Sequence, residues 1–157
     1  MNDKILREHL VKLLEGKQAH VSFKETLKNI NPKVRSTRPS KNTHSVWELL
    51  EHMRIAQEDI LNYILDASWK SPDWPESYWP SPDFDPSDEI FEKSVSAFLS
   101  DLDAIIGLAK DEKIDLTSGI PHAKQHTYLR EILIVADHNS YHLGQIIETR
   151  KMLGDWK

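Results

Sequence analysis

The sequence contains no cysteine. Disulfide bonds, cysteine nucleophiles and cysteine-ligated zinc sites are therefore excluded, and any bound metal ion must be held by histidines, carboxylates or carbonyl oxygens. Long apolar runs are missing too: no stretch approaches the roughly 18 consecutive apolar residues of a membrane span. The first 16 residues, MNDKILREHLVKLLEG, lack the uninterrupted apolar core of a signal peptide. We therefore expect a cytoplasmic protein with no membrane partner.

Positive charge is also in the minority. The chain has 20 Lys and Arg against 25 Asp and Glu, a formal net charge of −5, and the basic residues are dispersed. Because nucleic-acid-binding proteins carry a basic patch or stripe, we expect no nucleic-acid partner. A length of 157 residues, with 39% apolar and 29% charged residues, predicts one globular domain over 1–157. The eight histidines then become the residues to examine for chemistry.

Apolar residues recur with helical spacing in four segments. These four segments are 3–15, 45–65, 85–110 and 127–154. A weaker helical stretch covers residues 20–30, and the polar residues 31–42 connect it to the second main helix. With no convincing period-two strand, the sequence predicts an all-α four-helix bundle.

The ends of these helices carry recognisable signals. Gly16 is expected to stop the first helix. Ser45 and Glu48 form a capping-box pattern at the start of the second helix, in which each side chain satisfies a backbone N–H of the other residue. Asp85 and Pro86 are a suitable N-cap and first-turn pair for the third helix.

The connection between the second and third main helices is unusually long. It covers residues 67–85, reaches up to roughly 60 Å when extended, and can therefore run the full height of a bundle whose helices are about 30 Å long. The two helices that it joins can then run parallel, as in a crossover bundle. Among its aromatic residues are Trp69, Trp74, Tyr78 and Trp79. They suit a cluster that pins the connection to the core or a wall over a pocket, and the two interpretations are compatible.

Three histidines suit a metal site. His138 and His142 are four residues apart, so they lie about 40° apart on one helix and one turn from each other, at the border of the apolar face. His52 occupies a similar border position on the second helix. One ligand from one helix and two from a facing helix are a common way to build a metal site in a bundle. A His-x-x-x-His pair by itself is a weak signal, because two surface histidines would produce it too, and a lone border histidine is more often a hydrogen-bonded residue than a ligand.

The remaining histidines fit a shared ion less well. His126 lies twelve residues before His138, about 18 Å along a helix. His122 has the same four-residue spacing to His126, but Pro121 makes a helical face there unexpected. The others precede a helix cap or suit surface and border positions: His44, His9 and His20.

The sequence resembles the DinB family of damage-inducible-type bundle proteins. The resemblance rests on HSVWELLEHMRIAQEDIL (44–61), IPHAKQHTYLREIL (120–133) and LREILIVADHNSYHLGQIIETRKMLGDW (129–156), and it covers nearly the whole chain. It implies a bundle of up-down-down-up topology, with the long crossover between main helices two and three. It also implies a divalent metal ion on three histidines, which correspond to His52, His138 and His142, and a possible homodimer. Some related proteins are thiol transferases or metal-dependent hydrolases.

The first functional hypothesis is a metal-dependent enzyme. Three neutral imidazoles suit Zn, Ni or Fe(II) and leave positions for water or substrate. The ion would activate water or bind a thiolate, and because the chain has no cysteine, the thiol would have to come from a low-molecular-weight cosubstrate. The catalytic residues are unknown: Glu48 is a weak candidate for a general base, and Gln145 for a hydrogen bond to His142. Asp137 is expected to point elsewhere.

Two further hypotheses belong to other classes. The chain could be a non-enzymic bundle that binds a metal ion and a small ligand. It could also be a purely structural bundle whose histidines are hydrogen-bonded border residues. Metal analysis separates the structural hypothesis from the other two, and turnover separates the enzyme from the binder.

Overall fold

The computed structural model describes residues 3–16, 18–81 and 84–156. The chain is mostly helical, which confirms the predicted all-α class. Its elements in chain order are α1 (Lys4–Glu15), α2 (Phe23–Thr26), η1 (Pro32–Val34), α3 (Val46–Leu65), η2 (Glu76–Tyr78), α4 (Asp88–Lys110), β1 (Gly119–Ile120), β2 (Ala123–Thr127) and α5 (Tyr128–Met152).

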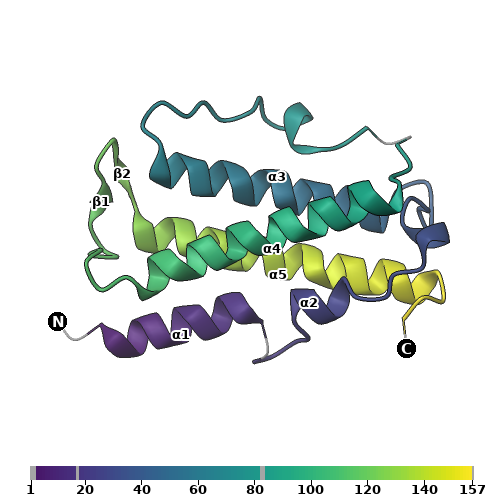
Figure 1. Cartoon of the computed structure of the whole chain (residues 1–157), viewed down its shortest axis with the longest axis horizontal. Helices are drawn as coiled ribbons and strands as arrows, with labels where there is room; N and C mark the ends of the chain where they lie inside the picture. Colours follow the sequence, from purple (N-terminus) through teal and green to yellow (C-terminus); the bar gives the residue numbers. More distant parts are fainter. Residues whose placement is uncertain (1–2, 17, 82–83, 157) are drawn as a thin grey trace.

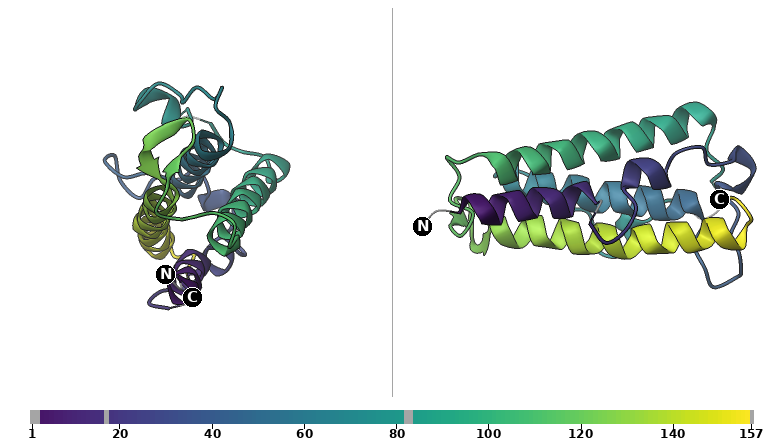
Figure 2. Two further views of the ribbon diagram at one scale, coloured as in Figure 1. Left: turned by 90° about the vertical axis from the view of Figure 1, so that its left-hand side faces the viewer. Right: turned by 90° about the horizontal axis from the view of Figure 1, so that it is seen from below.

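The four long helices pack side by side around one apolar core (Figures 1 and 2). α3 and α1 each contact both α4 and α5. Figure 1 shows α3 and α4 running in one direction and α1 and α5 in the other. The connection that follows α3 passes along the outside of that helix to the opposite end of the bundle, where α4 begins. Only a connection of this length allows two sequential helices to lie parallel.

Local signals determine where several helices begin and end. Ser45 Oγ accepts a hydrogen bond from the Glu48 N–H, and the Glu48 carboxylate accepts one from the Ser45 N–H, so the predicted capping box is confirmed. Gly16 ends α1 with a left-handed φ of 70°. Gly154, at φ 71°, closes the end of α5, where the N–H of Asp155 donates to the Arg150 carbonyl. These positive φ values explain why glycine stands at both positions.

Three predicted boundaries were wrong. α4 begins at Asp88 rather than near Asp85, because Ser87 Oγ caps the Ile90 N–H, whereas the Asp85 carboxylate accepts a hydrogen bond from Ser36. The helix predicted over 20–30 is only the four residues of α2, and Asn29 follows it in the left-handed region at φ 55°. α5 ends two residues before the predicted Gly154.

A small antiparallel hairpin, β1–β2, corrects the expectation that the chain has no strand. Ile120 pairs with Ala123 across a two-residue turn, and both side chains pack on Ile64 of α3. The first strand has only two residues, and the second has one buried position among five. A strand this short offers no alternation of apolar and polar residues to detect.

Polar contacts also cross the core and join α3, α4 and α5. The Gln57 amide on α3 donates a 2.7 Å hydrogen bond to the Phe98 carbonyl on α4 and accepts a 2.8 Å hydrogen bond from Asn139 on α5. Gln57 and Asn139 are both buried. One side chain thereby connects three helices and fixes how α3 and α5 face each other. Among the helices described, none is both long enough and apolar enough to cross a membrane.

Candidate metal centre

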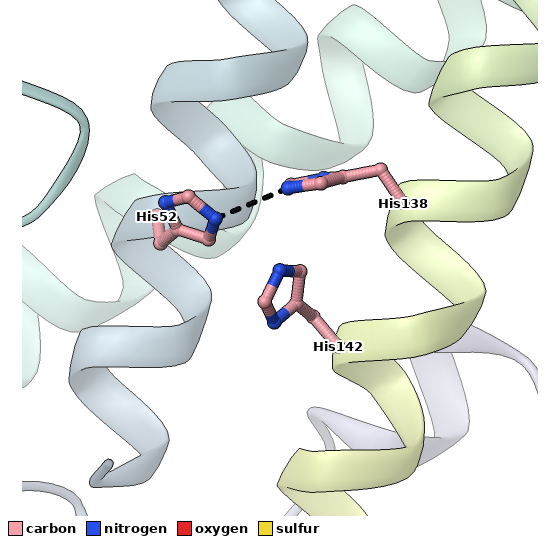
Figure 3. A group of neighbouring side chains, drawn as sticks. All are labelled: His52, His138 and His142. Atoms are coloured by element: carbon pink, nitrogen blue, oxygen red, sulfur yellow. Dashed lines mark hydrogen bonds between the residues drawn. The ribbon is translucent and has the colours of Figure 1, made fainter. Parts of the chain in front are cut away.

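Three histidines meet between α3 and α5. His52 comes from the first half of α3, and His138 and His142 lie one turn apart on α5. Their rings point toward one another across the space between the two helices (Figure 3). His52 and His142 are buried and His138 is half-buried. The structure therefore brings together the three histidines that the sequence analysis selected.

The distances within this cluster suit a shared ion. Each histidine offers one ring nitrogen, and these atoms all lie within 4.8 Å of one another. The Nε2 atoms of His52 and His138 are 3.1 Å apart. Two nitrogen ligands at the usual 2.0–2.1 Å from a tetrahedral zinc ion would be roughly 3.3 Å apart. The cluster is therefore already close to the spacing that one ion requires, and the three residues could hold a metal ion.

Hydrogen bonds orient two of the rings. His52 Nδ1 lies 2.9 Å from the Tyr78 main-chain carbonyl, and His142 Nδ1 lies 2.8 Å from Gln145 Oε1. Carbonyl and amide oxygens only accept hydrogen bonds, so each Nδ1 carries the proton. Each Nε2 then directs its lone pair into the cluster, where that of His52 accepts the 3.1 Å hydrogen bond from His138 Nε2, and unprotonated Nε2 atoms are usual for histidines that bind a metal ion.

The surroundings of the cluster favour neutral imidazoles. Burial lowers the pKa of His138 to about 4, assisted by the adjacent His142 and His52. Burial also lowers the pKa of His52 and of His142, outweighing the opposite effect of the hydrogen bonds that they donate to the Tyr78 carbonyl and to Gln145. All three rings are therefore uncharged at neutral pH, the form in which imidazole coordinates a metal.

Trp79 forms one wall of the cluster. Its ring stacks on His52 with centroids 3.9 Å apart and an interplanar angle of 1°. Trp79 also stacks on His44, with centroids 4.3 Å apart. Trp79 also packs against the main core, so the connection is pinned to the bundle and lines the site, as the two compatible interpretations of its aromatic residues anticipated. Trp74, in contrast, is largely exposed.

Sequence reasoning missed two groups near the ligands. His44 was set aside because it precedes a helix cap, and nothing in the sequence indicated that a residue of the crossover would stack on it. The Tyr78 carbonyl is a backbone group, and backbone hydrogen bonds to side chains leave no residue-type signature. Both depend on how the crossover folds back on α3.

The weak catalytic candidates lie in different settings. Gln145 contacts His142 as described, which suits a role in orienting that ring. Glu48 is buried. Its carboxylate accepts two hydrogen bonds from the Arg38 guanidinium and one from the Ser45 N–H. Burial raises the pKa of Glu48, but Arg38 and Ser45 outweigh it and the net pKa is lowered. An ion-paired carboxylate with a lowered pKa is a poor proton acceptor.

The other acidic and histidine residues lie outside the cluster. Asp137 is exposed, as expected. His126 lies in β2, and its Nδ1 is 2.9 Å from the Tyr63 hydroxyl, while His122 Nε2 is 2.8 Å from the Tyr63 carbonyl. These two histidines fasten the hairpin to α3. His9 is exposed, and His20 contacts the neighbouring Val21 carbonyl.

A cavity of about 210 Å³ lies at the end of the bundle where α3 begins. Its lining residues are Asn42, Thr43, His44, Leu49, Gln145, Glu148, Thr149 and Met152. Gln145 contacts His142 directly, and His44 is connected to His52 through Trp79. The cavity is smaller than the usual pocket for a drug-sized ligand, which is roughly 300–1,000 Å³.

The sequence model of the DinB superfamily matches residues 16–146. The chain belongs to the DinB superfamily. The matched region contains His52, His138, His142 and Gln145 together with the crossover, so the histidine cluster of this DinB protein lies within the part of the chain that defines its membership. No curated protein and no solved structure gives a significant match.

Proposed function

We propose that this DinB protein is a metal-dependent enzyme, a hydrolase or a thiol transferase, whose divalent ion is held by His52, His138 and His142. One observation carries the proposal: three neutral imidazoles converge, and two of them have Nδ1–H fixed by an acceptor so that Nε2 is unprotonated and faces the cluster. Histidines that only satisfy one another's hydrogen bonds do not require three rings aimed at one point. Zn, Ni and Fe(II) suit such ligands.

The chain's own residues would hold and shape the centre. His52, His138 and His142 would supply the ligands, Gln145 would fix the ring of His142, and Trp79 would exclude water from one face of His52. When bound, a divalent ion supplies Lewis-acid chemistry, which polarises a carbonyl or lowers the pKa of a water or thiol. Three protein ligands leave coordination positions for a substrate. A small molecule is the proposed substrate, and a low-molecular-weight thiol is the proposed cosubstrate because the chain has no cysteine.

A second candidate function is a non-enzymic bundle that binds a metal ion and a small ligand. The state of Glu48 favours it, because the carboxylate closest in sequence to His52 on the same helix face is engaged by Arg38 and by the helix cap. A hydrolase with this site would have to obtain its proton acceptor elsewhere. The homodimer and the cytoplasmic location stay predictions from the sequence.

The first experiment is metal analysis by mass spectrometry on protein purified without an affinity tag. The parent is compared with His52→Ala/His142→Ala and with His122→Ala/His126→Ala, a matched control that removes two histidines outside the cluster. We expect near-stoichiometric metal in the parent and the control, and none in the cluster variant. No metal in the parent, even after addition of Zn, Ni, Mn or Fe(II), would refute the proposal.

If metal is found, turnover separates the two candidates. The loaded protein is tested with esters, amides and thiol cosubstrates, with the His52→Ala/His142→Ala variant as the background. Conversion that requires the cluster supports the enzyme. A ligand that binds tightly and is never converted supports the non-enzymic bundle.

A further inference from the structure

One carboxylate of α3 binds two side chains of the crossover. Asp59 Oδ1 accepts a 2.7 Å hydrogen bond from the Trp69 indole N–H, and Asp59 Oδ2 accepts a 2.6 Å hydrogen bond from the Tyr78 hydroxyl. The two donors are nine residues apart in the crossover. Hydrogen bonds to an ionised acceptor are among the stronger ones in proteins. Asp59 therefore sets where this part of the crossover lies along α3.

Tyr78 links that anchor to the metal centre. Its hydroxyl binds Asp59, and its main-chain carbonyl accepts the 2.9 Å hydrogen bond from His52 Nδ1. His52 and Asp59 are seven residues apart, which places them on nearly the same face of α3, two turns from each other. Tyr78 thus runs alongside the helix and contacts it at both points. The next residue, Trp79, is then placed flat against the His52 ring.

We propose that Asp59 and Tyr78 are positioning residues of the metal centre. Asp59 holds the Tyr78 side chain, and the fixed Tyr78 carbonyl then holds His52 in the Nδ1–H tautomer and in the ring orientation that presents Nε2 to the ion. The inference rests on the proposed metal-binding function. Because binding equilibria are reciprocal, an ion on His52 would in turn hold the crossover against α3.

The predicted effect follows from the role of such outer hydrogen-bond partners. Their loss typically lowers metal affinity 10- to 100-fold. We expect roughly 10-fold weaker binding in Asp59→Ala and in Tyr78→Phe. The double variant should have about the same metal affinity as the single variant that binds more weakly, since both changes break the same chain of contacts. Trp69→Phe is the matched control: it removes the other donor to Asp59 and leaves the Tyr78 hydroxyl bond intact, so its affinity should stay close to that of the parent.

The closing experiment measures two properties in the parent, the single variants and the double variant. The first is zinc affinity by competition with a chromophoric chelator. The second is the tautomer of His52 in the metal-free protein, from the ¹⁵N chemical shifts of its ring. We expect a single Nδ1–H form in the parent and in Trp69→Phe, and a mixture of tautomers in Asp59→Ala and Tyr78→Phe. A general loss of stability would not change the tautomer of a folded protein.

The outcomes separate the two claims. A parent that binds no zinc refutes the proposed function and this inference with it. A parent that binds zinc, with variants of equal affinity and unchanged tautomer, overturns the positioning role alone. Independent, additive losses in the double variant overturn it as well. If Asp59→Ala does not fold, Tyr78→Phe decides the question, because it removes one hydroxyl from a side chain that otherwise keeps its packing.

Discussion

Protonating His138 should destabilise the folded, metal-free protein in mild acid. The ring is held neutral by burial and by two neighbouring imidazoles, and its pKa is about 4 against 6.5 for an unperturbed histidine. Between these two pH values the unfolded chain binds a proton at His138 that the folded chain does not. Stability is therefore fully present above about pH 6.5, falls as the pH drops toward 4, and stops falling below that value.

The size of the effect follows from the two pKa values. Each pH unit between them costs about 1.4 kcal/mol per proton, and the interval is about 2.5 units, so the ceiling is about 3.4 kcal/mol. The ring is only half-buried, so solvent screening reduces this value. We expect a loss of about 2 kcal/mol, a large fraction of the stability of a small domain.

The assay is urea unfolding in the presence of a chelator, at about pH 7 and in steps down to about pH 4. The comparison is with His138→Gln, which keeps a polar side chain without a titrating ring. Carboxylates and the other histidines titrate in both proteins, so the difference between the two pH profiles isolates the cluster. The variant should lose about 2 kcal/mol less than the parent over this range. Parallel profiles would refute the claim that the cluster holds His138 neutral.

Three further predictions concern the metal centre and the bundle. Zinc affinity should fall in acid, with an onset below pH 6.5 because the folded pKa values of the three imidazoles are lowered. Competition titrations that give a constant affinity from about pH 8 down to about pH 4 would contradict imidazole ligation. Gln145→Ala should weaken zinc binding 10- to 100-fold in the same titration, whereas Glu148→Ala, one turn away and exposed, should leave it unchanged. Phe98→Ala should lower the free energy of unfolding by about 3–5 kcal/mol in urea, since this core ring is fully buried, and a loss below about 1 kcal/mol would contradict its place in the core.

Helices with strong local signals could be predicted from the sequence. The capping box at Ser45 and Glu48 places the start of α3 correctly, and Thr127 caps α5 where the apolar periodicity begins. The length of the connection 67–85 indicated that a crossover is possible, and Figure 1 shows that the connection is a crossover. In each case the signal lies within the segment that it determines, so no tertiary information is needed.

Features that depend on contacts between distant segments could not be predicted. The hairpin β1–β2 exists because Ile120 and Ala123 pack on Ile64, and neither strand has a pattern of its own. The start of α4 depends on a choice between Asp85 and Ser87 as the cap, which the bond from Ser36 to Asp85 decides.

The candidate site divides in the same way. Helical spacing and the border of the apolar faces identified the three histidines, because those are properties of single helices. The partners of these histidines were harder to find. The hydrogen bond from His52 to the Tyr78 carbonyl and the stacking of His44 on Trp79 form only when the crossover folds against α3. The spacing of residues in the sequence does not indicate that arrangement.

The separation of the ligands along the chain has a consequence for biosynthesis. His52 and His138 are 86 residues apart, and α4 and the hairpin lie between them. At typical translation rates of about 5–20 residues per second, a ribosome needs on the order of ten seconds to pass from one to the other. A nascent chain that has not yet emerged as far as α5 offers a single imidazole of the three. An ion shared by all three histidines can therefore be bound only after α5 has been synthesised and has packed on α3, so the folded bundle takes it from the buffered metal pool.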